Sequence, residues 1–266
     1  HVRVLLAVIN WHLGFPKTAA RQVQEANQIA RDEQHPWGIT YAAFYSAWIH
    51  QSRTDARATQ EYADRAARLA EEKGFRFWMP LVNYMRSWAS NRDSSDPSRP
   101  RDREGGENMQ TALQQFRGIG SGMGVTYLLF RLAEEYIGLG LLEEAEKLLE
   151  EARELLQANG ELFVEAEYHR LHGRICLERF RQNEDQESLE RASEHFQRAL
   201  ARAQHHESKA LELRSSMDRA EVLSLQGKHE QAQSLLDGIV QRFDEMDDSG
   251  DCSRAVKMLK ELKKKT

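Results

Sequence analysis

Cysteine and long apolar runs are scarce in this sequence, and each absence excludes a class of protein. The chain has two cysteines among 266 residues, Cys176 and Cys252. They are too few for a disulfide framework, so we expect a reducing, cytoplasmic location. No stretch approaches the roughly 20 apolar residues that a membrane-spanning helix needs. The net charge of −5 leaves no basic excess for binding phosphates. We therefore expect neither a membrane nor nucleic acid as a partner.

Catalytic, metal-binding and nucleotide-binding motifs are scarce as well. Glu165, His169 and His172 are spaced to lie near one helix face, which permits a metal site. No HExxH arrangement is present, however, and we favour packed or capping histidines. The alternating glycines from Gly118 to Gly124 join two predicted helices and lack a Gly-Lys-Ser/Thr ending, so we interpret them as a turn between repeats. We expect no catalytic residue, metal or cofactor, and an enzyme is the least favoured hypothesis.

The segment 126–156 predicts one complete helical hairpin. Its first half places apolar residues at helical spacing, and two glycines, Gly138 and Gly140, then interrupt the helix. Its second half repeats the helical spacing, with Glu and Lys on the opposite, solvated face. Two small residues in that half, Ala145 and Ala152, mark the positions where two helices approach closely. The pattern L-x2-L-A-x2-Y…G…A-x6-A resembles the tetratricopeptide repeat.

The same seven-residue pair of small residues recurs along the chain at intervals of 40 to 47 residues. Besides Ala145/Ala152, the pairs are Ala19/Ala26, Thr59/Ala66, Gly105/Ala112, Ala192/Ala199 and Ala232/Ile239. The two longer intervals each contain a polar insertion, 91–104 and 181–186. We expect 91–104 to be a mobile loop, because its Asp, Ser, Pro and Arg residues cannot bury apolar area.

These repeats predict an all-α fold, a right-handed α-solenoid of about six tetratricopeptide-like (TPR-like) hairpins. A last amphipathic helix, Cys252–Lys264, would cap the open end, because a solenoid needs a polar terminal surface. We expect a single repeat domain over 1–266, with at least about 70% helix. The chain begins at His1 in the middle of a helical pattern, so we also expect it to be a segment of a longer protein.

Three stretches carry a further resemblance that extends from about 41 to 246. They are Glu72–Ala89, the GIGSGMG turn and Val164–Glu178, of which EAEYHRLHG is the most specific. They resemble the C-terminal repeat region of bacterial signalling proteins, in which a signal-transduction ATPase module precedes the repeats, often behind a nucleotide cyclase or Ser/Thr kinase domain. The family more often has Lys-Gly-Glu where this chain has His172-Gly173-Arg174, so the charge differs at that point.

Projection of the first helix of each hairpin onto the repeat template predicts a groove for a ligand or partner. Its predicted residues are Tyr41, Phe44, Trp48, Tyr84, Trp88, Tyr127, Phe130, Glu167, Arg170 and Arg174. The N-terminal half is aromatic and the C-terminal half is charged, and aromatic residues beside Arg are typical of binding hot spots. The alternative is that the aromatic residues pack between helices. We expect Arg170 to be exposed, so that its replacement by Ala would hardly change stability.

Two functional hypotheses follow from this groove. The first is a non-catalytic interaction and regulatory module that binds a protein or peptide, including an ATPase, cyclase or kinase domain of the same polypeptide. That intramolecular partner is implied by the family resemblance alone. The second is a small-molecule sensor that controls such a domain, because an aromatic groove also suits a sugar or an amphiphile. A thermal shift with a metabolite would favour the sensor, and co-purification of a protein would favour the interaction module.

Overall fold

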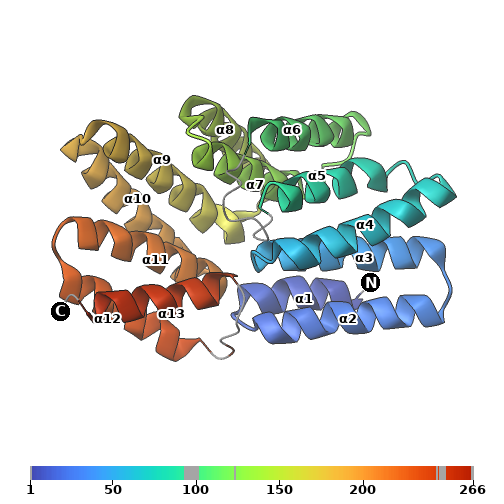
Figure 1. The fold of residues 1–266 in the computed structure, drawn as a ribbon, viewed down its shortest axis with the longest axis horizontal. Helices are drawn as coiled ribbons and strands as arrows, with labels where there is room; N and C mark the ends of the chain where they lie inside the picture. Colours follow the sequence, from blue (N-terminus) through green and yellow to red (C-terminus); the bar gives the residue numbers. More distant parts are fainter. Residues whose placement is uncertain (1, 93–101, 123, 244, 246–249, 265–266) are drawn as a thin grey trace. The chain divides into compact units, whose positions relative to one another are not determined.

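The computed structural model describes residues 2–92, 102–122, 124–243, 245 and 250–264 (Figure 1). Of these residues 85% are helical, in thirteen α-helices and one short 3-10 helix, and none of them lies in a strand. The predicted all-α helical repeat fold is therefore confirmed. The first six helices are α1 (Val2–His12), α2 (Pro16–Asp32), α3 (Pro36–Ser52), α4 (Ala56–Lys73), α5 (Trp78–Ser90) and α6 (Arg103–Gly118). The next five are α7 (Val125–Gly138), α8 (Leu142–Asn159), α9 (Glu165–Asn183), α10 (Gln186–His205) and α11 (Lys209–Leu225), with the 3-10 helix Leu162–Val164 before α9. The last two are α12 (His229–Arg242) and α13 (Gly250–Leu262).

The chain divides into two compact units, each built from helical hairpins. The first comprises His1–Trp11 and Phe15–Val125, and the second comprises His12–Gly14 and Thr126–Thr266. A single continuous domain over 1–266 stays a prediction. Most of the predicted insertion 91–104 lies outside the described residues, but α6 begins at Arg103, within the predicted insertion. No described helix is long and apolar enough to cross a membrane.

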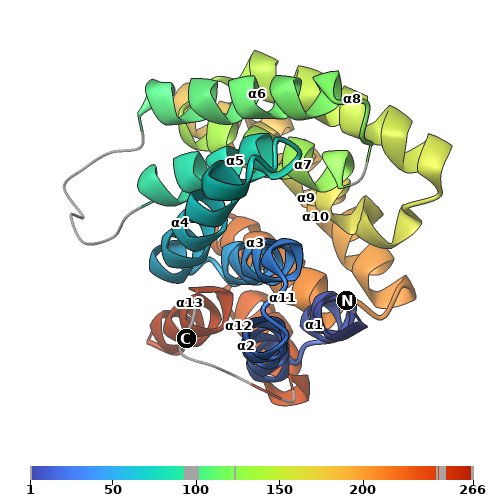
Figure 2. The ribbon, with the colours of Figure 1, turned by 90° about the vertical axis from the view of Figure 1, so that its right-hand side faces the viewer.

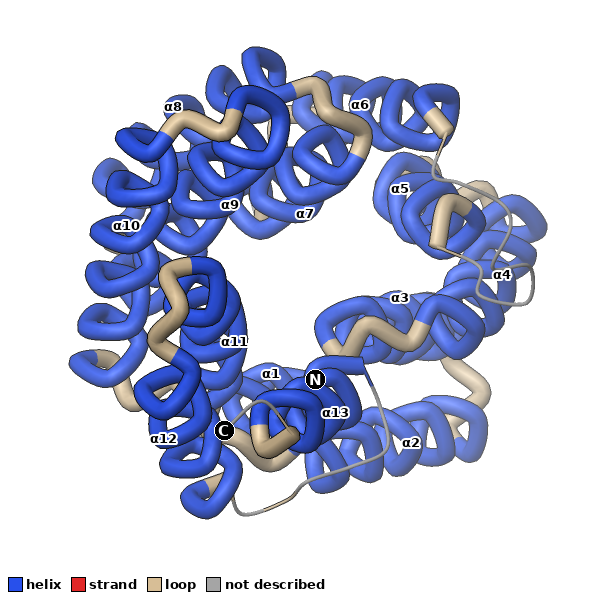
Figure 3. The backbone as a smooth tube through the Cα atoms, turned by 60° about the vertical axis from the view of Figure 1, so that its left-hand side comes forward, coloured by secondary structure: helices blue, strands red, loops and turns tan. Residues whose placement is uncertain are grey.

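In the first unit, helices α2 to α6 pack in chain order, each against the next (Figure 2). The first helices of the second and third hairpins, α3 and α5, also contact each other directly. They form one layer, and α2, α4 and α6 form the other (Figure 3). We call these the first-helix layer and the second-helix layer.

Turn and capping residues explain where these helices begin and end. Pro16 and Pro36 occupy the first turn of α2 and α3, where a missing N–H costs nothing. Asp55 caps the start of α4 and accepts a hydrogen bond from the Ala58 N–H at 3.0 Å. Gly74 ends α4 in the left-handed conformation, with φ of 69°, which favours glycine because it has no Cβ. The hairpin boundaries are thus set by local chemistry.

The second unit repeats the same construction with α8 to α13 packed in chain order. Helices α7, α9 and α11 lie in its first-helix layer, and α8, α10 and α12 lie in its second-helix layer (Figure 3). Helix α13 packs on α11 and α12, with Cys252, Ala255, Leu259 and Leu262 buried. It therefore covers the last hairpin, as the sequence predicts for a capping helix.

The small-residue pairs of the second helices are buried almost throughout. Both members are fully or nearly fully buried at Thr59/Ala66, Ala145/Ala152, Ala192/Ala199 and Ala232/Ile239. The exceptions are Ala26 and Gly105, which are half-buried. Two helices also approach closely at Gly173 in α9, where an added Cβ would stand 2.5 Å from the Phe196 ring of α10. Only glycine leaves room for that ring, so Gly173 sets the spacing of the fifth hairpin.

Candidate functional site

The first-helix layer of the second unit carries a network of charged side chains instead of an apolar surface. We call it the charged network. Its members are Arg131 and Glu134 on α7, Glu167, Arg170 and Arg174 on α9, Arg214 and Asp218 on α11, and Asp251 on α13. Neighbouring members on one helix stand three or four residues apart, so each helix turns them toward the same face. The network therefore links the three helices of this layer, α7, α9 and α11, to the capping helix α13.

Arg170 lies at the centre of the charged network and has only 1% of its surface exposed. Its Nε donates to Glu167 Oε2 at 2.7 Å, and its Nη1 donates to Asp218 Oδ2 at 2.9 Å. Its Nη2 donates to Glu167 Oε1 at 2.8 Å and to Glu134 Oε1 at 2.9 Å. Burial by itself would lower the pKa of Arg170, but these carboxylates outweigh burial and raise the pKa well above its usual value. Arg170 is therefore a permanent buried cation.

Glu167 is the carboxylate on which three arginines converge. Besides Arg170, it pairs with Arg131 of α7, and Arg214 Nη1 lies 3.8 Å from its Oε1. Burial opposes ionisation of this carboxyl, but the arginines outweigh burial and lower its pKa to about 2. Glu167 is therefore ionised throughout the physiological range, and it joins α7, α9 and α11.

The edges of the charged network are more open to solvent. Arg174 Nη1 donates to Asp218 Oδ1 at 3.2 Å, and the Arg174 side chain keeps 25% of its surface exposed. The nearby Asp218 carboxylate raises the pKa of Arg174. At the α7 end, the Arg131 guanidinium lies 5.7 Å from the centre of the partly exposed Tyr127 ring. These edges present charge and an aromatic face to solvent.

A buried network of this kind is costly for the fold. Each ion loses its hydration on burial, and apolar side chains of equal volume often stabilise a protein as well or better. The described contacts pair most of these ions with opposite charges. This pairing offsets part of the free-energy cost of burying them but does not make the network favourable by itself. The stability of the fold by itself therefore does not require a charged network in this layer.

The structure buries some of the ten predicted groove residues and leaves others partly exposed. Seven of the ten are aromatic, and four of these, Phe44, Tyr84, Trp88 and Phe130, are buried. For these four the prediction of a groove surface is wrong, and the alternative of packing between helices is correct. Phe44, for example, packs on Trp78 with ring centres 5.2 Å apart. Among the predicted residues that keep exposed surface are Tyr41, Trp48, Tyr127 and Arg174.

The charged half of the predicted groove is also more buried than the sequence indicates. Glu167 and Arg170 are buried within the charged network, so the expectation of an exposed Arg170 is wrong. The ten predicted groove residues do not include Asp218, which follows Met217 directly in α11. Met217 belongs to the apolar core. One feature of the sequence could have indicated the network. Arg214 and Asp218 are oppositely charged and stand four residues apart in a helix that is buried all round.

Trp48 packs against the glycine turn that follows α6. An added Cβ at Gly124, which has φ of +72°, would stand 2.7 Å from the Trp48 ring. The turn thus has a packing role in the first unit, which agrees with its interpretation as a connection between repeats.

The histidines singled out in the sequence lie between α9 and α10. His172 stacks on His195 with ring centres 5.4 Å apart, and His169 lies 6.0 Å from His195. Burial, followed by neighbouring positive charge, lowers the pKa of each of the three to about 4. Among the described residues no three His, Cys, Asp or Glu side chains are placed to hold a metal ion. Cys176 is buried, and burial raises the pKa of its thiol.

The comparisons with known proteins identify the fold. No protein-family model and no curated protein matches the sequence. Among solved structures, the crystal structure of a Rap protein complexed with Competence and Sporulation Factor superimposes with a TM-score of 0.62 at 12% identity, covering 99% of this chain and 74% of that chain. A Signal Transduction ATPase with Numerous Domains (STAND) protein with a tetratricopeptide repeat sensor, from Pyrococcus horikoshii, gives a TM-score of 0.49 at 13% identity, covering 98% and 38%. The likeness to the Rap protein shows a shared TPR-like helical repeat fold.

Proposed function

We propose that this chain is a non-catalytic interaction and regulatory module that binds a protein or peptide on the first-helix layer of its second unit. The charged network carries this proposal. The three helices of this layer and the capping helix α13 hold buried and half-buried ions of both signs, at a cost that apolar side chains would avoid. At the edges of the network Arg174 and Tyr127 keep exposed surface, and exposed Arg and aromatic residues are typical of binding hot spots.

The repeat fold supports the same function. Stacked helical hairpins offer one extended layer of first helices, which repeat proteins use to bind peptides and domains. The Rap protein that shares this fold is in complex with Competence and Sporulation Factor. By analogy, this chain would bind a protein or peptide partner. The family resemblance of the sequence implies that it would do so in the cytoplasm, on behalf of a catalytic domain such as an ATPase, cyclase or kinase.

Arg174 is the residue that would recognise the partner. Only its Nη1 is engaged by Asp218, and a quarter of its side chain is exposed. Its remaining donors suit a carboxylate of an acidic peptide, because a guanidinium binds a carboxylate with two parallel hydrogen bonds. Tyr127 and Glu134, both half-buried, would contact the apolar and basic residues of the same peptide.

The test is selection of peptides from a random library on the immobilised protein, followed by affinity measurement for the winners. We expect acidic peptides, whose affinity falls about tenfold or more in the Arg174→Ala variant. The matched control is Arg153→Ala, which removes an exposed arginine of α8 that pairs with Glu150 in the second-helix layer. Equal losses in the two variants would contradict the proposal.

The same experiment separates the interaction module from a sensor. A thermal shift with a metabolite library, combined with failure to select any peptide, would favour the small-molecule sensor. Selection of peptides that bind the wild-type protein and not Arg174→Ala would uphold the interaction module.

A further inference from the structure

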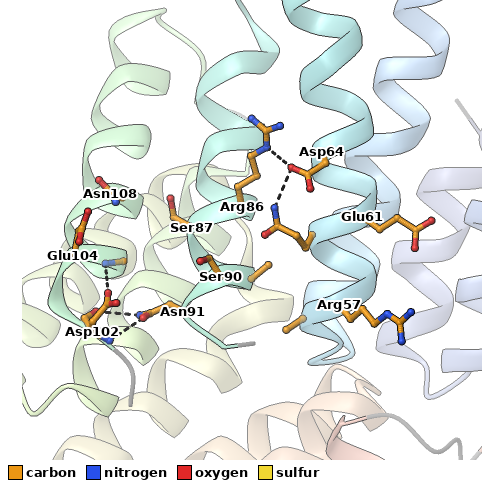
Figure 4. A pocket seen from close by; sticks show the side chains of 14 residues that line it. Arg57, Glu61, Asp64, Arg86, Ser87, Ser90, Asn91, Asp102, Glu104 and Asn108 are labelled. Carbon is orange, nitrogen blue, oxygen red and sulfur yellow. Dashed lines mark hydrogen bonds and ion pairs between the residues drawn. The ribbon is translucent and has the colours of Figure 1, made fainter. Parts of the chain in front are cut away.

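A pocket in the first unit lies outside the charged network and has no role in the proposed function. It has a volume of about 680 Å³, and its lining comes from three elements, α4, the C-terminal end of α5 and the N-terminal end of α6 (Figure 4). Pockets for small ligands commonly have volumes of about 300–1,000 Å³. The pocket is therefore large enough for a small organic ligand or for the side chains of a peptide.

The α4 wall of the pocket presents hydrogen-bond acceptors. Gln60 and Asp64 both line the pocket, one helical turn apart on α4. The Asp64 side chain points toward Arg86 of α5 (Figure 4). Asp64 Oδ1 accepts from Arg86 Nε at 2.7 Å and from Gln60 Nε2 at 3.0 Å. Gln60 Oε1 is buried and has no hydrogen-bond partner among the residues that the structure describes. A buried acceptor without a donor is unfavourable, so this wall lacks a donor that a ligand would supply.

The α6 wall is held in place by its own contacts. Gly105 N–H donates to the capping carboxylate of Asp102 at 2.7 Å, and Asp102 N–H donates to Asn91 Oδ1 at 2.9 Å (Figure 4). An added Cβ at Gly105 would stand 2.6 Å from Asn91 Cγ, so α5 and α6 meet closely here. The wall is thus formed before any ligand arrives, which reduces the ordering that binding would require.

The charges of the lining favour a cation. Among the described residues of the lining, four carboxylates, namely those of Glu61, Asp64, Asp102 and Glu104, stand against the two guanidinium groups of Arg57 and Arg86. Arg86 is already paired with Asp64. Glu61 and Glu104 are exposed on opposite sides of the pocket, on α4 and α6. The excess of acceptors and of negative charge matches a ligand that carries several N–H donors and a positive charge.

We propose that this pocket binds a guanidinium or ammonium group that donates to Gln60 Oε1 between the carboxylates of α4 and α6. Two sources supply this chemistry. One is a free cationic metabolite of the guanidine or polyamine class, and the other is an Arg or Lys side chain of a peptide. Either would be held by hydrogen bonds to the α4 wall and by the charge of the rim.

The proposal is tested by titration calorimetry of the full chain with agmatine and, separately, with the tripeptide Gly-Arg-Gly. We expect binding of at least one probe, weakened about tenfold or more by Gln60→Leu and by the double substitution Glu61→Gln/Glu104→Gln. Both double-variant positions are exposed, so this variant keeps its fold even if Gln60→Leu perturbs packing. The control is Glu107→Gln, which removes an exposed α6 carboxylate outside the lining and should not change affinity.

The two probes distinguish the sources. Tighter binding of agmatine indicates a free metabolite, and tighter binding of the tripeptide indicates a peptide side chain. Absence of binding of both probes would overturn the proposal, as would equal weakening by Glu107→Gln. The peptide selection described above tests Arg174 in the second unit. A negative result there would contradict the proposed function but not the binding of a cation in this pocket.

Discussion

Replacement of Arg170 by Ala removes the central cation of the charged network. The guanidinium makes four hydrogen bonds to the carboxylates of Glu167, Asp218 and Glu134, at distances between 2.7 and 2.9 Å. Both Glu167 and Asp218 are buried, with 4% and 3% of their surfaces exposed. The variant therefore leaves two buried carboxylates without their principal partner.

The magnitude follows from that loss. Breaking a buried ion pair by removing one partner costs about 3–5 kcal/mol, because the remaining charge is neither hydrated nor paired. We expect the upper part of this range, since Arg170 serves two buried carboxylates at once. For a chain of this size the corresponding fall in melting temperature is roughly 10 °C. The size of this loss also distinguishes a buried Arg170 from an exposed one, because removal of an exposed Arg170 would hardly change the free energy of unfolding.

The assay is urea unfolding followed by the helical circular dichroism signal. The Arg153→Ala variant is the control, because Arg153 is exposed on α8 and its loss should cost less than about 0.5 kcal/mol. The pH adds a second readout. Because the folded pKa of Glu167 is about 2, below its usual 4.5, its contribution is fully present above pH 4.5 and is lost as pH falls toward 2.

In the Arg170→Ala variant the pKa of Glu167 should rise, because burial is then less opposed by positive charge. The difference in stability between the variant and the wild-type protein should therefore shrink as the pH falls below about 4.5. A loss below about 1 kcal/mol at neutral pH, or a loss equal to that of Arg153→Ala, would refute this account of the network.

Two further predictions concern α9 and its neighbours. Gly173→Ala should destabilise the protein by about 1–3 kcal/mol, because its Cβ would overlap the Phe196 ring. The control Gly238→Ala in α12 has open space around the added Cβ and should stabilise the protein by up to about 1 kcal/mol. Equal effects of the two substitutions in urea unfolding would contradict this prediction. The histidine cluster predicts an acid-sensitive stability: folded pKa values of about 4 lie below the usual 6.5, so folding favours the neutral rings and stability should fall between pH 6.5 and 4. Replacement of His195 by Gln should reduce that slope, and an unchanged slope would argue against the cluster. The residues concerned are His169, His172 and His195.

The hairpins and their boundaries could be read from the sequence alone, because their causes are local. The small-residue pair Ala145/Ala152, its recurrence along the chain and the turn residues between helices all act within one hairpin. Helix starts at Pro16 and Pro36 and the cap at Asp55 depend on the backbone within one turn. The capping role of α13 follows likewise from its amphipathic pattern and its place at the end of the repeats.

The exposure of individual side chains could not be read in the same way. A repeat template places Phe44, Trp88 and Arg170 on one helix face, but the neighbouring hairpins decide whether that face is covered. The partners in the charged network lie far apart in sequence, as Arg170 and Asp218 do, and an error of one residue in register exchanges Asp218 for the core residue Met217. The pocket of the first unit likewise needs three helices at once. Burial and ion pairing depend on which surfaces face each other, and only tertiary packing brings those surfaces together.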